Sequence, residues 1–411
     1  MSIVETFNFF KKNKLEILLI SFFPIFLILG NFFINFCYIA LTLISIQNIK
    51  KNKQFFNSSI FYLLIFFLIC LFLNIIFSSN INNSFPRLLK FILIIFVIIE
   101  LQKFDFTNEY SVKKIINFWI VTFLIVTADI IFELIFGFNT FGYVSNLQGR
   151  IASFFGDELI VGVFYHFFGL IFISYLISKK YSDYWILIIA SGVIFLSFMI
   201  GERANFVRMF VSIFLILFLL LKINVFKKLI SLFVIMIILI FTISVNANLK
   251  NRYYGQLKSI YTLNGIEKYF KESQYGAHQD TAFQIFKNNK MFGVGMKNFR
   301  EESKKEIYEN TEYKRNDSRQ ATHPHQIHLE LLSETGLIGY LSFFMLILYS
   351  IYFSLKNYIK DKNPIQLSTI IFLFTSLFPL LPSGSIFSTY YGGIFWFNYA
   401  LMLSFNSKFK S

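Results

Sequence analysis

Long apolar runs separated by polar connections dominate the pattern of this chain. Each run has about twenty residues, enough for a helix that crosses the hydrocarbon core of a bilayer. Twelve runs can be placed, at about residues 15–30, 32–48, 59–78, 88–102, 115–136, 157–178, 184–200, 204–221, 229–246, 336–355, 365–382 and 391–406. Because backbone polar groups cannot stay unpaired in lipid and no strand-type alternation is present, these runs should be helical. The pattern predicts an all-α membrane protein with about twelve transmembrane helices.

The composition supports a membrane protein and narrows its class. Hydrophobic residues make up 56% of the 411 residues and charged residues only 15%, and phenylalanine alone occupies 58 positions. A soluble core cannot cover so much apolar surface, which excludes a freely soluble enzyme, a disordered chain and a secreted disulfide scaffold. The two cysteines lie inside apolar runs and indicate no disulfide framework. The classes of protein that the composition still allows are a membrane enzyme, a transporter and a channel.

The formal charge of +15 is unevenly distributed between alternate connections. Nineteen lysines lie in one set of connections and in the two terminal segments, whereas the short connections of the other set carry Arg87, Arg150 and Arg203, with Lys90 near a run edge. Since basic residues accumulate on the cytoplasmic side, the lysine-rich connections and both termini should be cytoplasmic. Membrane topology therefore explains the charge, and we predict no nucleic-acid partner.

One long hydrophilic segment, residues 247–326, joins the ninth and tenth runs on the outer side. It contains fourteen basic and nine acidic residues. Helical spacing at 281–287, a glycine-containing turn at 291–296 and a charged amphipathic stretch at 298–313 predict a mostly helical cap. The chain should thus divide into nine transmembrane helices at 1–246, an outer loop domain at 247–335 and three further transmembrane helices at 336–411.

Arginine replaces lysine in the short outer connections. Arg150 lies in the loop sequence QGRIASFFG, Arg203 lies in the turn GERANF, and Arg208 follows about one and a half helical turns deeper. A guanidinium presents a planar fork of donors that suits phosphate, so the outer arginines are candidates for binding an anionic substrate. The alternative is a structural role, in which the side chains extend to lipid headgroups or pair with Asp129 or Glu133.

Three of the five histidines lie within six residues, in the sequence THPHQIHLELLSETGLIG at 322–339. Pro324 suits the first position of a helix, so a helix should begin there, with Thr322 or His323 as its cap. The same helix should break at 335–336, before the tenth apolar run.

His325 would lie in the first turn of that helix, with His328 three residues on and on the same face. The helix dipole disfavours an imidazolium there and the free amides can hold an anion, so His325 is a candidate general base. A structural histidine cluster and a metal site are the alternatives. No cysteine or well-spaced carboxylate completes a metal site, so we predict that no metal is bound.

Several segments resemble the O-antigen ligase family. His325-Gln326, nine residues and then Gly336-x-x-Gly339 are similar to the signature that this family carries at the end of its large periplasmic loop. The other similar segments are QGRIASFFGDE, GERANF, FKNNKMFGVGMKNF and PSGSIFSTYYGGIFW at 382–396. The likeness covers most of residues 140–400. Asn289-Lys290 departs from the family, which usually has a proline there, and this difference concerns loop geometry rather than chemistry.

The resemblance implies a GT-C-like glycosyltransferase in the bacterial inner membrane, surrounded by membrane lipids, with its active site on the periplasmic face. Such an enzyme moves a glycan from undecaprenyl pyrophosphate to a hydroxyl of lipid A-core, in a metal-independent, inverting step without a cofactor. The residues that the resemblance and their chemistry assign to catalysis are His325, Arg150 and Arg203, and those assigned to substrate binding are Arg208, Arg87, His328, His323 and Gln326. The family also contains O-antigen polymerases, whose acceptor is a lipid-linked repeat unit, and the motif does not separate the two.

The residues suit this reaction independently of the resemblance. Breaking a sugar–diphosphate bond develops negative charge on the leaving group, so a catalyst needs fixed cations there and a base near the acceptor. None of the seven aspartates has another two positions away, which argues against a nucleotide donor held through metal by an Asp-x-Asp pair. A flippase or ion-coupled transporter is the third hypothesis, but His166 is the only ionisable residue near the centre of a run and no internal repeat is visible.

Overall fold

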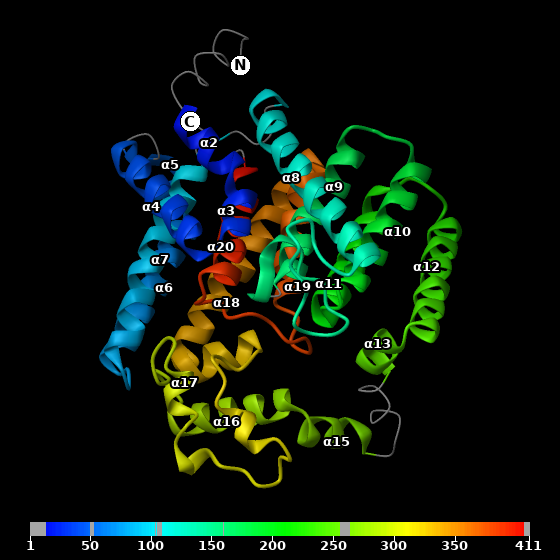
Figure 1. Cartoon of the computed structure of the whole chain (residues 1–411). Coiled ribbons are helices and arrows are strands. Elements are labelled where there is room, and N and C mark those ends of the chain that lie inside the picture. The colour runs from blue at the N-terminus through cyan, green and yellow to red at the C-terminus, as the bar shows by residue number, and fades with distance from the viewer. Residues whose placement is uncertain are drawn as a thin grey trace.

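The computed structural model describes residues 14–49, 53–102, 104, 109–158, 160–254 and 264–406. Every predicted apolar run contains a helix, and the first run is divided between two (Figure 1). These helices are α2 (Lys14–Ser21), α3 (Phe23–Leu29), α4 (Asn31–Gln47), α6 (Ser59–Ile76), α7 (Ile81–Leu101), α8 (Glu109–Phe136), α9 (Val161–Ser178), α10 (Asp183–Met199), α11 (Arg203–Leu220), α12 (Val225–Val245), α18 (Ile327–Asp361), α19 (Pro364–Ser376) and α20 (Tyr390–Ser404). No strand occurs among the described residues, which confirms the all-α prediction.

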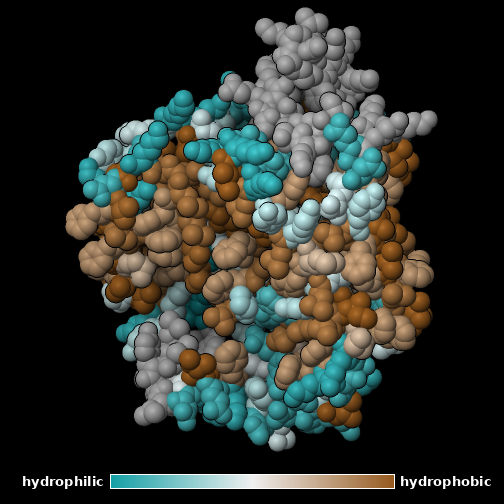
Figure 2. Space-filling model, turned by 180° about the vertical axis from the view of Figure 1, so that it is seen from behind, coloured by the Kyte–Doolittle hydropathy of each residue, from teal (hydrophilic) through white to brown (hydrophobic). Residues whose placement is uncertain are grey.

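The helices are those of a multi-pass membrane protein. Six are long and apolar enough to cross a membrane, namely α6, residues 113–136 of α8, α9, α11, α12 and α18, while α4, α10 and α19 are apolar but shorter. Figure 2 shows hydrophobic residues in a broad belt across the middle of the molecule, with hydrophilic residues above and below it. Twelve crossings stay a prediction. The terminal lysines that predicted the orientation, at 1–13 and 407–411, lie outside the described residues.

The centre of the bundle is formed by α9 and α20. α9 packs on α8, α10, α11 and α19, and α20 packs on α7 and α19. Every residue of α20 is buried, which suits a helix that is predominantly apolar on all faces. Phe397 of α20 stacks on Phe23 of α3, with ring centroids 3.7 Å apart. α12 buries only three of its residues and therefore lies at the edge of the bundle.

Shorter helices gather at one end of the bundle. α15 (Gly265–Glu272), α16 (Gln274–Asn288) and α17 (Phe299–Glu302) lie opposite the end where α2 begins and α20 ends (Figure 1). α16 contains the predicted helical segment 281–287 and packs on α18. Of the stretch 298–313, only α17 and a 3-10 turn at Glu306–Tyr308 are helical. This part of the cap is less helical than predicted, because its charged residues do not present a continuous apolar face to a neighbour.

Candidate active site

Five of the predicted site residues contact the connection between α19 and α20, residues 377–389, which we call the C-terminal loop; they are Arg208, His323, His325, Gln326 and His328. The amide of Ser383 donates to the carbonyl of His325 at 2.8 Å, and a ring nitrogen of His323 lies 3.3 Å from the carbonyl of Ser383. A guanidinium nitrogen of Arg208 donates to the carbonyl of Pro382 at 2.7 Å, across 174 residues of sequence. The C-terminal loop therefore joins the histidine motif to the start of α11.

Arg208 is almost fully buried and is satisfied by the protein itself. Besides Pro382, it donates to the carbonyl of Thr375 at 3.3 Å and to the side-chain oxygen of Asn205 at 3.1 Å. A buried cation needs such partners, and here they come from the end of α19, from the C-terminal loop and from Asn205 of α11 itself. Arg208 thus anchors the loop, and its direct contact with substrate stays a prediction.

α18, the helix of the histidine motif, begins at Ile327 and not at Pro324 as predicted. Gln326 is its N-cap, and the side-chain oxygen accepts from the amide of Leu329 at 2.7 Å. The side-chain nitrogen of Gln326 donates to the carbonyl of Pro379 at 2.9 Å. The predicted start was wrong because Gln326 supplies the capping acceptor while its nitrogen is held by the distant C-terminal loop. The side-chain oxygen and the side-chain nitrogen of Gln326, a predicted substrate-binding residue, therefore both hydrogen-bond within the protein.

His325 lies just outside α18 with a left-handed backbone, φ 54°, a conformation that is uncommon for a residue with a side chain and often marks a functional site. Its ring centroid is 4.0 Å from that of His323, 5.3 Å from that of His278 and 5.6 Å from that of Tyr275. Burial, together with the charges of His278 and Lys297, lowers the pKa of His325 to about 4. The ring is therefore neutral near pH 7, with burial rather than the helix dipole as the main cause.

His328 lies in different surroundings. Its ring nitrogens are 3.1 Å from the hydroxyl of Tyr340 and 2.9 Å from the carbonyl of Leu377, and its ring stacks on Phe344 with centroids 5.0 Å apart. Helical spacing does not place it beside His325, because His325 lies outside the helix. The contacts of His328 join α18 to the end of α19, and its part in substrate binding stays a prediction.

Arg150 and Arg203 lie together, and a third arginine, Arg252, joins them. A guanidinium nitrogen of Arg150 is 3.8 Å from a carboxylate oxygen of Glu202. Arg203 donates to the carbonyl of Arg252 at 3.2 Å, and Arg252 donates through Nε to the carbonyl of Gly201 at 2.7 Å. The sequence did not single out Arg252, because only its residue type distinguishes it within the long charged segment. We call these three residues the arginine group.

A glycine allows the loop of Arg150 to lie against the turn of Arg203. Gly201 has φ 79°, and a β-carbon at this position would collide with the carbonyl oxygen of Gly149. Across the same contact, the amide of Ile151 donates to the carbonyl of Ile200 at 3.1 Å.

Two carboxylates of α8 hold the Arg150 loop from its other side. Glu133 accepts from the amides of Ala152 and Ser153 at 3.0 and 2.7 Å, and Asp129 accepts from the hydroxyl of Ser153 at 2.6 Å. These are the carboxylates that the sequence offered as partners for the arginines. They position the loop backbone, which places Arg150 beside Glu202.

A buried carboxylate, Glu202, lies beside the arginine group. Glu202 is buried and also accepts from the amide of Gly162 at 2.9 Å; burial raises its pKa, and the charge of Arg150 opposes that shift. Burial lowers the pKa of Arg252, and the charges of Arg150 and Arg203 lower it further. Three guanidinium groups thus gather in one place, which suits an anionic ligand such as phosphate.

Tyr275 links the arginine group to His325. Its ring contacts that of His325, and it lies within electrostatic reach of Arg252, where it opposes the lowering of the pKa that burial causes. Arg252 follows α13 (Ala247–Leu249) closely in sequence, and α13 and the start of α18 lie at the end of the bundle where α15 to α17 gather (Figure 1). Arg87 belongs to a different group, which lies with Lys90 at the C-terminal loop.

The predicted break in α18 is confirmed at Gly336, where φ is 67°. A β-carbon there would collide with the carbonyl of Met291, because the turn at 291–296 crosses the helix at this point. Beside the break, Glu334 accepts from the amides of Lys297 and Phe299 at 2.7 and 3.3 Å. Sequence reasoning missed Lys297 and Glu334, since their importance comes from contact between two motifs that are separate in the sequence.

Residues 185–344 match the family model of O-antigen ligase. The chain contains an O-antigen ligase domain. No curated protein matches the chain in sequence. The ligase domain includes Arg203, Arg252 and His325, whereas Arg150 and the C-terminal loop lie outside the matched residues and contact it. The family resemblance is therefore confirmed, and the ligase domain makes the chain a glycosyltransferase-like membrane enzyme of the O-antigen ligase and polymerase type, whose substrates are lipid-linked glycans.

Proposed function

We propose that the protein transfers a glycan from undecaprenyl pyrophosphate to a hydroxyl of lipid A-core on the periplasmic face of the bacterial inner membrane. The observation that carries this proposal is that Arg150, Arg203 and Arg252 lie together at the same end of the bundle as His325, whose ring is neutral near pH 7. An anion site next to a proton acceptor is what transfer from a lipid diphosphate requires.

The chemical step uses the two groups differently. The acceptor oxygen attacks C1 of the sugar from the face opposite the diphosphate, and the bond from C1 to the diphosphate oxygen breaks with its electron pair on that oxygen. The arginine group stabilises the charge that develops there, and His325 accepts the hydroxyl proton. The stereochemistry at C1 is inverted.

The space beside Arg150 supports a place for the donor sugar. A cavity of about 280 Å³ opens between the loop at 137–151 and the start of α13. Its lining includes the amide side chains of Gln148, Asn246 and Asn248 beside Arg150, and such groups hydrogen-bond well to sugar hydroxyls. The diphosphate would lie on the arginines with its glycan in this cavity.

The topology that fits this reaction has twelve crossings with both termini cytoplasmic. The arrangement of the helices supports this topology. α2 begins and α20 ends at one end of the bundle, whereas α15 to α17 and the arginine group lie at the opposite end. Residues 1–246 would then supply nine crossings, 247–335 the periplasmic loop domain and 336–411 three more.

Replacing His278 by glutamine should move the acid limb of the pH profile of transfer upward. His278 lowers the pKa of His325, so its removal raises that pKa from about 4 toward the ordinary value. A base must be unprotonated, so the rate of the variant falls at a higher pH than that of the wild type. The measurement is kcat/KM against pH. E301Q, which removes an exposed carboxylate of α17, is the control, and coincident acid limbs for H278Q and wild type would contradict the role of His278.

Transfer should continue at an undiminished rate in a chelator. No group of three or more His, Cys, Asp or Glu side chains that could hold a metal ion occurs within the described parts of the chain. The arginine group supplies positive charge at the diphosphate, a task that a metal performs in other transferases. Purified enzyme assayed with and without EDTA tests this, and a loss of activity that a divalent cation restores would show that the step depends on metal.

The acceptor distinguishes a ligase from a polymerase. Deletion of the gene should remove all O-antigen from lipid A-core and cause lipid-linked polymer to accumulate. Lipopolysaccharide with a single repeat unit in the deletion strain would instead identify a polymerase. Reconstitution with a defined lipid-linked oligosaccharide and each acceptor in turn gives the same answer with purified protein.

A further inference from the structure

A second group of cations lies at the C-terminal loop, formed by Arg87 and Lys90 of α7 and Lys297 of the turn that follows α16. The ammonium of Lys90 donates to the carbonyl of Ser388 at 3.1 Å, and that of Lys297 donates to the hydroxyl of Ser385 at 2.9 Å. Both lysines therefore hold the same short turn. Arg87 and Lys297 are close enough to Lys90 for their charges to repel it.

The nearby carboxylates are occupied by other donors. Glu330 binds the hydroxyl of Ser385 and accepts from the amide of Ile386 at 3.0 Å, and Glu334 accepts from two backbone amides. Within the described residues, neither Arg87 nor Lys90 forms an ion pair, and the buried Nε of Arg87 has no hydrogen-bond partner. The charge of Lys297 is balanced in part by Glu330 and Glu334, which lie within its electrostatic reach. Arg87 and Lys90 repel each other without a carboxylate partner, so their end of the group suits an anion.

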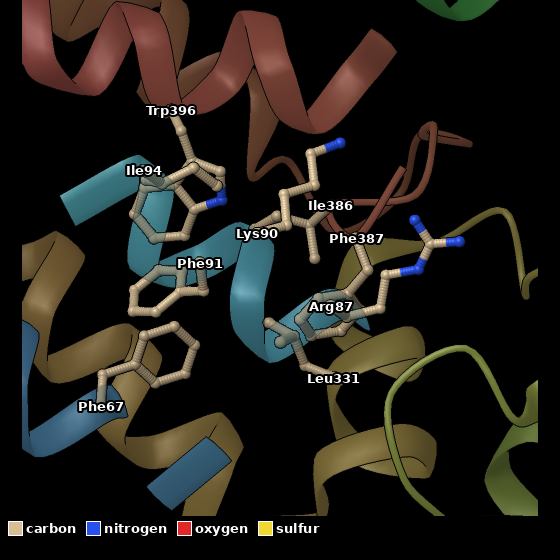
Figure 3. Close-up of a pocket in the computed structure, with 9 residues that line it drawn as sticks. All are labelled: Phe67, Arg87, Lys90, Phe91, Ile94, Leu331, Ile386, Phe387 and Trp396. Atoms are coloured by element: carbon tan, nitrogen blue, oxygen red, sulfur yellow. The ribbon is translucent and has the colours of Figure 1, made fainter. Parts of the chain in front are cut away.

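The walls beside these cations are apolar. Phe67, Phe91 and Trp396 line the same pocket as Arg87 and Lys90, and Figure 3 shows the aromatic rings gathered on one side while the charged ends of Arg87 and Lys90 lie on the other. The enclosed space is about 10 Å³, roughly one water molecule, so it holds no lipid tail.

A lipid can approach along the outside of α7. Phe85 and Leu89, one helical turn apart, are 49% and 47% exposed and form an apolar face of α7 that lies about 100° around the helix axis from Lys90. A lipid whose tail lies along this face would extend its phosphate around α7, past the exposed Pro86, to reach Lys90.

We propose that Arg87, Lys90 and Lys297 form a second anion site, which binds the phosphate of a lipid substrate separately from the arginine group. His325 lies within electrostatic reach of Lys297 and is linked to Arg252 through Tyr275. The inference rests on the proposed function, in which the arginine group holds the donor diphosphate, and it assigns the second site to a phosphate of the lipid acceptor.

Binding of farnesyl phosphate to the purified full-length protein in detergent tests the proposal, with the number of bound molecules measured by native mass spectrometry. Wild type should bind two molecules, and R87Q/K90Q and R150Q/R203Q should each bind one. K287Q/K304Q removes two exposed lysines with the same loss of charge and should bind two. One site in wild type, or two in R87Q/K90Q, would overturn the proposal.

A charge-conserving variant and two competing ligands serve as controls for the binding experiment. R87K/K90R keeps both charges and should retain two sites, which separates loss of the anion site from loss of folding. Inorganic phosphate and farnesol, added separately at the concentration of farnesyl phosphate, should each fail to displace it. Displacement by inorganic phosphate from the site lost in R87Q/K90Q would identify a site for a free anion and reject the lipid assignment.

The kinetics of glycan transfer show whether the second site binds the acceptor or the donor. In R87Q/K90Q the KM for the acceptor should rise by about tenfold or more while the KM for the donor is unchanged, since a hydrogen bond to a charged group is lost. A rise in donor KM alone would place the phosphate on the donor and overturn the acceptor assignment. Two binding sites without any transfer in wild type would reject the proposed function alone, whereas transfer with a single binding site would reject only the second site.

Discussion

Replacement of His325 by alanine should lower the rate of glycan transfer by about 10²–10⁴-fold, the usual contribution of a general base. The neutral ring beside His278 and His323 is the group positioned to take the acceptor proton in the proposed step. KM for the donor should change little, because the arginine group is intact. The measurement is the initial rate of transfer by purified protein from a defined lipid-linked glycan, together with the amount of protein in the membrane.

His325 has a left-handed backbone, so alanine could also alter the local fold. Asparagine tolerates this conformation better than most residues, which makes H325N the matched control for the backbone. H325A and H325N should be equally impaired and should both keep the thermal stability of the wild type. Normal transfer in H325N would show that the imidazole is not the base.

Changing Arg150 or Arg203 to lysine should reduce kcat/KM by about 10–100-fold in each case. A lysine keeps the charge and loses the planar fork, and a hydrogen bond to a charged group contributes about 1.5–3 kcal/mol. In Arg203→Lys the contact with the carbonyl of Arg252 is also lost, so that variant tests the cohesion of the arginine group. The effect is measured by transfer kinetics at varied donor concentration.

Arg300→Lys, at an exposed position in α17, is the control for arginine-to-lysine replacement in the same part of the protein and should leave the kinetics unchanged. Arg252→Lys should resemble the two variants above, although the sequence alone gave no reason to test it. Full activity in either Arg150→Lys or Arg203→Lys would contradict a clamp that depends on forked contacts.

The apolar runs were sufficient to locate the transmembrane segments as helices. In lipid the backbone must pair within its own segment, so local composition is enough to decide that a run is helical. The break at Gly336 was predictable for a similar reason, because a glycine after a helical stretch is a local signal. The start of α18 could not be predicted in this way, because the cap at Gln326 is supported by the carbonyl of Pro379, a contact that no local pattern contains.

The sequence by itself determined the helices, the residue types suited to diphosphate and proton transfer, and the family. Only the tertiary structure brought Arg252 to Arg150 and Arg203, separated His328 from His325, and gathered Lys90 and Lys297 at the C-terminal loop. The physical reason is the range of the interactions. Helix formation depends on neighbours a few residues away, whereas these hydrogen bonds and charge contacts join segments that approach one another only when the bundle has assembled.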